Sequence, residues 1–253
     1  MPLLEVRELT VRFGGVVALD RLSFDVNGGE VVALIGPNGA GKTTLFNVIT
    51  RVYKPAAGSV SIDGVPVSRM PPHHVVRHGL ARTFQNVALF RSMSVLENVI
   101  VGDHIRTNSG WAESTIPMPR AMRAESACKK RAIEMIDFVG LSAVEAHPVA
   151  ALPFGIQKRV ELARALVSKP RLLLLDEPAG GISHEEVDAM GRLLRRIKGE
   201  LDVTVLLVEH HMAFVMGISD RVVVLDFGRK IAEGSPSEVQ RNPAVIEAYL
   251  GAA

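Results

Sequence analysis

A glycine-rich segment near the N-terminus has the residue types needed to hold a chain of phosphates. It reads Gly36-Pro37-Asn38-Gly39-Ala40-Gly41-Lys42-Thr43 and continues into Thr44, and it fits the pattern G-x-x-x-x-G-K-[ST]. Glycines let backbone N–H groups converge on phosphate oxygens without a Cβ in the way. The lysine reaches the β- and γ-phosphates, and the Thr43 hydroxyl can ligate Mg²⁺. The segment therefore predicts a site for a nucleoside triphosphate, with ATP and Mg²⁺ as the expected ligands.

A second set of candidate residues lies far along the chain. Asp176 and Glu177 follow the apolar run Leu172–Leu175, which predicts a buried strand with two carboxylates at its C-terminal end, where open α/β sheets bind ligands. Asp176 is expected to hold Mg²⁺ through water, and Glu177 to polarise the attacking water. Because an Asp-Glu pair after an apolar run is by itself more often only a strand end, this interpretation depends on the phosphate loop.

The elements that must position these residues show two kinds of strand pattern. Apolar residues alternate in 4–13, 22–26 and 60–62, which predicts half-buried antiparallel strands, with a hairpin turn at Asp63-Gly64. Unbroken apolar runs predict strands buried on both faces, as in a parallel sheet flanked by helices. These runs are Val31–Ile35, Leu172–Leu175, Val203–Val208 and Val222–Leu225.

The middle of the chain has a helical pattern. Periodicity from about 94 to 166 predicts a mostly helical insertion, interrupted by a loop over 102–119. Near the end, Ser235-Pro236-Ser237-Glu238 has the spacing of a capping box, and Asn242-Pro243 predicts a second helix start. The expected fold is therefore α/β, with N-terminal antiparallel strands, a parallel sheet core and a helical subdomain.

Composition excludes several classes of protein. The chain has 253 residues, is 47% hydrophobic and carries a formal net charge of only +2, so no nucleic-acid partner is expected. The lone Cys128 cannot form an intramolecular disulfide and fits a reducing compartment. No secretory signal and no run of roughly 18 apolar residues appears. The prediction is a cytoplasmic protein that reaches a membrane only through partners.

With these residues in view, the sequence resembles the ATP-binding cassette family over almost its whole length, 1–253, as a single cassette. The resemblance implies the P-loop NTPase fold with a RecA-like parallel sheet core, an N-terminal antiparallel β-subdomain and a helical subdomain at about 94–166. Four further segments carry it. They are the signature segment Leu152-Pro153-Phe154-Gly155-Ile156-Gln157 with the helix 158–166, the Q-loop Gln85, the D-loop Gly180-Gly181-Ile182-Ser183, and Glu209-His210-His211.

The resemblance implies roles for individual residues. Gln85 would contact Mg²⁺ or the attacking water, and His210 would bond to the γ-phosphate and hold Glu177 and water in register. Phe13 matches the position that stacks on adenine, although its place in an alternating strand leaves a core role open. Pro153 and Gly155 would address the ATP of a partner cassette. Pro153, Ser183 and His211 stand where the family usually has serine, aspartate and aspartate.

The stretch from Arg82 to Val99, the Leu-Pro signature and the tail 245–251 resemble the ATP-binding subunits of branched-chain amino acid importers, with urea and short-chain amide importers as near relatives. This implies ATP hydrolysis coupled to transport by a cassette pair. The partners would be a second cassette, either a homologous chain or another copy, and two integral membrane permeases. A periplasmic binding protein would act indirectly, and the chain would sit on the inner face of the membrane. A cassette ATPase not coupled to transport is the alternative. A nucleoside kinase or G protein would lack the signature segment.

Overall fold

The computed structural model of the chain describes residues 2–83, 87–103 and 119–250. These residues fall into two compact units. The first comprises Met1–Leu80, Arg171–Gly180 and His184–Ala253, and the second Ala81–Pro170 and Gly181–Ser183. The range 94–166, for which a helical subdomain is expected, lies within the second unit.

The first unit opens with a four-stranded antiparallel sheet. Its order is β2-β1-β4-β5, and Leu4 of the first strand pairs with Val26 on one side and with Ile62 on the other. The alternating segments therefore form the predicted antiparallel strands, and Asp63-Gly64 is the turn between the last two. The strands are β1 (Leu4–Phe13), β2 (Val16–Val26), β4 (Ala57–Ile62) and β5 (Val65–Pro66).

A second sheet, which belongs to this unit except for Ala81 and Arg82 of its last strand, is largely parallel and confirms the prediction drawn from the unbroken apolar runs. Its order is β10-β9-β3-β8-β7-β6; β3 pairs in parallel with β8 and β9, β7 pairs in parallel with β8, and β10 returns antiparallel. Every residue of β3, β7 and β8 is buried. The strands are β3 (Val31–Ile35), β6 (Leu80–Arg82), β7 (Leu172–Asp176), β8 (Thr204–Val208), β9 (Arg221–Asp226) and β10 (Arg229–Gly234).

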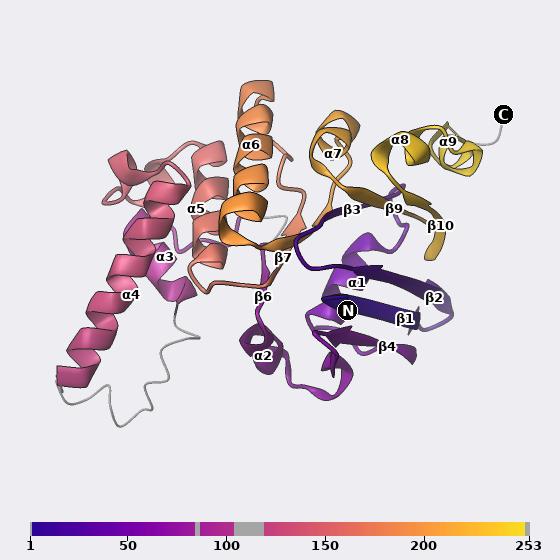
Figure 1. Cartoon of the computed structure of the whole chain (residues 1–253), viewed down its shortest axis with the longest axis horizontal. Helices are drawn as coiled ribbons and strands as arrows, with labels where there is room; N and C mark the ends of the chain where they lie inside the picture. Colours follow the sequence, from indigo (N-terminus) through magenta and orange to yellow (C-terminus); the bar gives the residue numbers. More distant parts are fainter. Residues whose placement is uncertain (1, 84–86, 104–118, 251–253) are drawn as a thin grey trace. The chain divides into compact units, whose positions relative to one another are not determined.

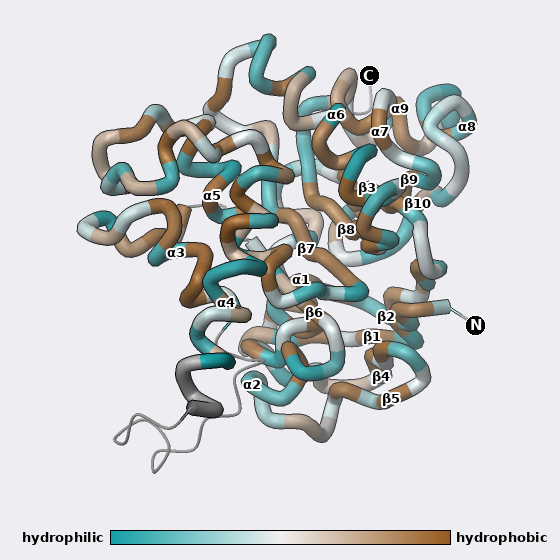
Figure 2. The backbone as a smooth tube through the Cα atoms, turned by 60° about the vertical axis from the view of Figure 1, so that its left-hand side comes forward, coloured by the Kyte–Doolittle hydropathy of each residue, from teal (hydrophilic) through white to brown (hydrophobic). Residues whose placement is uncertain are grey.

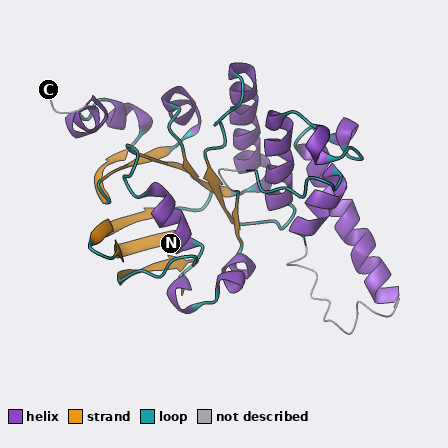
Figure 3. Ribbon diagram, turned by 180° about the vertical axis from the view of Figure 1, so that it is seen from behind, coloured by secondary structure: helices purple, strands orange, loops and turns teal. Residues whose placement is uncertain are grey.

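Helices cover both faces of the parallel sheet. Helix α1 (Lys42–Ile49) lies between the two sheets of the unit, whereas α6 (His184–Leu201) and α7 (Met212–Ile218) lie on the opposite face (Figures 1 and 3). Alternate strand residues, such as Val32 and Leu34 of β3, join Phe46 of α1 in one hydrophobic core. The hydrophobic residues of β7 appear in brown in Figure 2. Burial of each such side chain contributes about 1.5–3 kcal/mol, so this core fixes the strand ends that carry the site.

Two short helices end the first unit. They are α8 (Pro236–Gln240) and α9 (Pro243–Leu250). The capping box predicted at Ser235 is present, because its hydroxyl accepts from the Glu238 amide and the Glu238 carboxylate accepts from the Ser235 amide. Earlier in the chain, α2 (Pro72–Val75) is a single turn.

The second unit is helical. It contains α3 (Val95–Gly102), α4 (Pro119–Phe138) and α5 (Phe154–Leu166). A capping box that the sequence analysis did not use starts α3, where Ser94 and Glu97 satisfy each other's backbone amides. The fully buried Asp103, just past α3, is bound by Arg131 of α4. Most of the loop predicted at 102–119 lies outside the described residues, and within the described residues no helix is long and apolar enough to cross a membrane.

Candidate active site

The glycine-rich segment forms the turn between β3 and α1. Gly41 precedes the helix in a left-handed conformation, with φ +98°, and α1 begins at Lys42. A Cβ on Gly36 would lie 2.1 Å from the Leu225 carbonyl oxygen, and one on Gly41 would lie 2.7 Å from the Ala18 carbonyl oxygen. The amides of this loop can face a ligand because glycine lets the backbone pack this closely on its rear side.

The rear of the loop is held by the turn between β9 and β10. The Gly228 amide donates to the Ala40 carbonyl at 3.1 Å, and the Gly228 carbonyl accepts from the Asp20 amide of β2 at 2.9 Å. A Cβ on Gly228 would lie 2.6 Å from the Ala18 carbonyl oxygen. The turn therefore fits against both the loop and β2 without room for a side chain at this position.

Lys42 folds back over the loop. Its Nζ donates to the Gly36 carbonyl at 2.6 Å and to the Pro37 carbonyl at 2.8 Å. Burial lowers the pKa of Lys42 below its ordinary value, while the carboxylates of Glu177 and Asp176 act in the opposite direction. The ammonium group and the two carboxylates thus share one electrostatic environment, although they are far apart in sequence.

The two carboxylates stand at the carboxyl end of β7. Asp176 is the last residue of the strand, pairs with Val208 and is 5% exposed. Glu177 turns the chain with φ +50°, and its amide donates to the Val208 carbonyl at 2.9 Å. A left-handed non-glycine residue costs about 1–2 kcal/mol, and such strain collects at functional sites. The Glu177 side chain is 27% exposed, so water can reach it.

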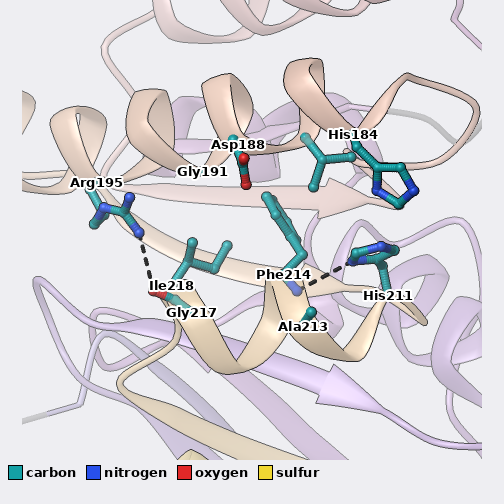
Figure 4. A pocket seen from close by; sticks show the side chains of 10 residues that line it. His184, Asp188, Gly191, Arg195, His211, Ala213, Phe214, Gly217 and Ile218 are labelled. Atoms are coloured by element: carbon teal, nitrogen blue, oxygen red, sulfur yellow. Dashed lines mark hydrogen bonds between the residues drawn. The ribbon is translucent and has the colours of Figure 1, made fainter.

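The two neighbouring histidines take different positions. His210 Nδ1 lies 3.8 Å from Glu177 Oε1, and the His210 side chain is 65% exposed. His211 Nδ1 instead accepts from the Phe214 amide at 3.3 Å and caps α7 (Figure 4). Its ring faces a pocket of about 240 Å³ between α6 and α7, which His184 also lines. The geometry therefore places His210 beside the carboxylate and gives His211 a structural bond.

Glu209 is a residue of this region to which the sequence analysis assigned no role. It is 1% exposed. Oε1 accepts from the Ala179 amide at 2.7 Å, and Oε2 accepts from the His210 and His211 amides at 2.9 and 3.2 Å. The sequence signal for Glu209 was its position directly after an unbroken apolar run. Burial of its carboxylate could not be predicted from this, because it depends on two loops that come together in the fold.

Phe13 lies at the end of β1 and is 46% exposed. The alternative of a core role for this residue is therefore wrong. Its ring meets Tyr53 edge to face, with centroids 5.1 Å apart. The exposed ring is available to stack on a planar ligand.

The signature segment starts α5 in the second unit. Pro153 is the N-cap and makes no side-chain capping bond, and Gly155 is buried in the first turn. The Phe154 ring is 42% exposed, with Lys158 Nζ 5.4 Å from its centroid. A Cβ on Gly181 would lie 3.1 Å from Phe154 Cε1, so the D-loop and the signature pack together at this point.

The remaining predicted residues are placed as follows. Thr43 and Thr44 lie in the first turn of α1, with Thr43 exposed, and Asn38 and Gly39 are exposed at the tip of the loop. Gln85 lies outside the described residues. In the first unit the structure brings Lys42, Asp176, Glu177 and His210 to strand ends on the same edge of one sheet, since β3, β8 and β7 are parallel neighbours.

A phosphate loop and two carboxylates at one sheet edge fit many nucleotide-binding proteins, and comparison with known proteins narrows the choice. Residues 19–180 match the family model described as ABC transporter. The chain belongs to the ABC transporter family. As a member of this family it is an ATP-binding protein and an ATPase.

Relatives and solved structures of ABC cassettes cover the whole chain. The high-affinity branched-chain amino acid transport ATP-binding protein BraF of Pseudomonas aeruginosa is 41% identical over all of this chain and 99% of its own length, and LivG of Escherichia coli K12 is 40% identical with the same coverage. A nucleotide-free cassette of an ABC transporter superposes with a TM-score of 0.86 at 30% identity, covering both chains fully. A cassette in its ADP conformation gives 0.85 at 31%. Residues 229–253 match the model described as branched-chain amino acid ATP-binding cassette transporter.

Proposed function

We propose that this ABC protein is the ATP-hydrolysing subunit of an importer for branched-chain amino acids. The observation that carries the proposal is its identity of 41% with a branched-chain amino acid transport ATP-binding protein over all of this chain and 99% of the relative. The match of residues 229–253 to a branched-chain cassette model supports the same substrate class. The substrate would not touch this chain, so its identity is argued through these relatives.

In this proposal, the loop from Gly36 to Thr43 and the neighbouring Thr44 hold the β- and γ-phosphates of ATP, with Lys42 exchanging its loop carbonyls for phosphate oxygens. Phe13 stacks on the adenine. Glu177 accepts a hydrogen bond from the attacking water and polarises it. His210, 3.8 Å from the Glu177 carboxylate, keeps that carboxylate and the γ-phosphate in register.

Mg²⁺ is the metal we propose for this site. Thr43 offers an exposed hydroxyl and Asp176 a carboxylate at the strand end, which are the hard oxygen donors that Mg²⁺ prefers; Gln85 is the third proposed ligand. Mg²⁺ keeps several waters and needs only one or two protein carboxylates beside the phosphates. When bound, the ion would neutralise charge on the phosphate oxygens.

The proposed assembly pairs this cassette with a second one, head to tail. Pro153 and Gly155 at the start of α5 would then face the partner's ATP, since the N-terminus of a helix favours an anion. Two membrane permeases would respond to movements of the cassette pair, and a periplasmic binding protein would deliver the substrate. The chain itself would be attached to the cytoplasmic face of the membrane through the permeases.

Uptake in a deletion strain tests this function. Cells lacking the gene should lose uptake of radiolabelled leucine, isoleucine and valine, and the wild-type gene should restore it while the Lys42→Ala gene should not. Uptake of urea and acetamide, measured in the same cells, should be unchanged. Loss of urea or amide uptake alone would show that the importer carries that class of substrate instead of branched-chain amino acids. Unchanged uptake of all of them, with no permease recovered from membranes by a tagged chain, would overturn the transport proposal.

A further inference from the structure

The side chain of Glu209 joins two loops that end neighbouring strands. Its carboxylate sits at the end of β8 and is almost fully buried. One oxygen binds the amide of Ala179, two residues after Glu177, and the other binds the amides of His210 and His211. A buried carboxylate is costly unless it is well bonded, and three backbone donors meet that need here.

The bonds fix the loop that carries Glu177. The Gly180 amide donates to the Glu177 carbonyl at 3.1 Å and closes a tight turn, and the Glu209 bond to Ala179 lies inside this turn. On the other side, the bond to the His210 amide fixes the backbone from which the imidazole projects. The separation of 3.8 Å between His210 and Glu177 therefore depends on one side chain that holds both backbones.

Only a carboxylate satisfies all three donors. Both oxygens of an ionised glutamate are acceptors, whereas glutamine has one acceptor oxygen and an NH₂ group that would face N–H donors. Glutamine has nearly the same size, so replacing Glu209 with it tests the bonds without opening a large cavity. At least one of the two loops would lose its partner.

We propose that Glu209 is a positioning residue for ATP hydrolysis, which sets the loop after Glu177 and the loop of His210 at a fixed spacing. It does not touch the nucleotide in this scheme and acts through the two residues it places. The inference rests on the proposed roles of Glu177 and His210.

The main test compares Glu209→Gln with Thr204→Val in steady-state ATP hydrolysis. Thr204 is the first residue of the same strand, is 1% exposed, and its hydroxyl accepts from the Gly29 amide at 2.9 Å. Both changes remove a buried acceptor for a backbone amide, but Thr204 is at the opposite end of β8. We expect Glu209→Gln to lower kcat by about ten- to a hundredfold, because small misplacements of reacting groups have effects of this size. The KM for ATP should change less than about threefold, and Thr204→Val should leave kcat within about twofold.

A double variant tests whether Glu209 acts through His210. In a His210→Ala background, Glu209→Gln should cost a smaller factor in kcat than in the wild-type background, because part of its effect has already been removed. Equal factors in both backgrounds would overturn the link to His210. Thermal unfolding of all variants identifies any loss that follows from partial unfolding.

Hydrogen exchange gives a second readout that does not need turnover. In Glu209→Gln, the amides of Ala179, His210 or His211 should exchange faster, while those of β3 and β9 should not. A kcat equal to that of the wild type, or unchanged exchange at all three amides, would overturn the inference. A wild-type chain that never hydrolyses ATP with Mg²⁺ would instead overturn the proposed function, and exchange would then still show whether Glu209 holds the two loops.

Discussion

His210 Nδ1 lies 3.8 Å from Glu177 Oε1 and 3.9 Å from Glu209 Oε2. The imidazole is thus near two carboxylates of different kinds. Glu209 is buried and bonded to backbone amides, whereas Glu177 is partly exposed at the strand end. Of these two carboxylates, only that of Glu177 is placed to meet a water molecule.

Glu177→Gln should strongly reduce turnover and leave ATP bound. Glutamine cannot take up a proton from water as a carboxylate can, so kcat should fall by about a hundredfold or more, while the Kd for ATP stays within about threefold. Hydrolysis and equilibrium binding of ATP measure the two effects. Glu200→Gln, which changes an exposed glutamate paired with Arg196 on α6, serves as the control. Normal hydrolysis by Glu177→Gln would show that another group polarises the water.

Lys42→Ala should weaken ATP binding by about a hundredfold, because a hydrogen bond to a charged partner contributes about 1.5–3 kcal/mol. The loop should keep its shape, since its glycines and backbone bonds remain. Isothermal titration with ATP measures the loss. Lys54→Ala removes the same charge from an exposed position and should bind ATP normally. Equal affinities for both variants would remove Lys42 from the phosphate site.

Asp176→Asn should raise the Mg²⁺ concentration needed for half-maximal hydrolysis by about tenfold or more, as changes in groups that hold a metal through water commonly do. Chelation of Mg²⁺ by EDTA should stop hydrolysis by the wild-type protein, and added Mg²⁺ should restore it. Asp188→Asn, an exposed position on α6, should leave the Mg²⁺ dependence unchanged. An unaltered Mg²⁺ titration for Asp176→Asn would contradict the assignment.

The contact of Phe154 with Gly181 predicts a non-additive pair. Gly181→Ala should lower stability for two reasons, a φ of +74° and a Cβ 3.1 Å from the Phe154 ring; the backbone part alone costs about 1–2 kcal/mol. In a Phe154→Ala background the second reason disappears, so the loss should be smaller. Gly140→Ala is the matched control, because Gly140 has φ +73° and no neighbour within 4 Å.

Thermal unfolding of these single and double variants completes the cycle. The loss caused by Gly140→Ala should be the same with and without Phe154. Equal losses for Gly181→Ala in both backgrounds would show that the ring does not constrain the D-loop.

Cys128 should react slowly in the folded protein. Burial, with a smaller effect of Asp103, raises the pKa of its thiol from 9.0 to about 11. The thiolate is the reactive form, so at about pH 8 alkylation by iodoacetamide should be roughly a hundredfold slower than in the unfolded chain. Because the pKa of the thiol is raised in the folded chain, folding favours its neutral form. The contribution of this thiol to the free energy of unfolding is therefore present below pH 9.0 and is lost as the pH rises towards 11. Equal rates of alkylation in the folded and the unfolded chain would contradict the burial.

The elements could be predicted because their signals are local. Val31–Ile35 is apolar throughout and becomes a strand buried on both faces, and the capping box at Ser235 requires only residues within one turn. The order of the strands could not be predicted in this way. β3 lies between β8 and β9, and no short sequence pattern shows which strands a segment will pair with.

The same limit explains what was missed in the site. The residue types of the phosphate loop and of Asp176-Glu177 identify their chemistry. The left-handed backbone of Glu177 could not be predicted, because no glycine stands at this position to indicate it. The pattern alone favoured His210 over His211, and only the capping bond to the Phe214 amide shows what His211 does. Glu209 has a function only where two loops converge, which its neighbours in sequence do not reveal.

The turn at Gly228, which supports Ala40 from behind, has a consequence for dissecting the chain. A fragment that stops before β9 would contain every residue of the glycine-rich segment and still lack the surface against which that segment is shaped. Truncation from the C-terminus should therefore destroy the capacity to retain a nucleotide well before it reaches any residue that the nucleotide touches.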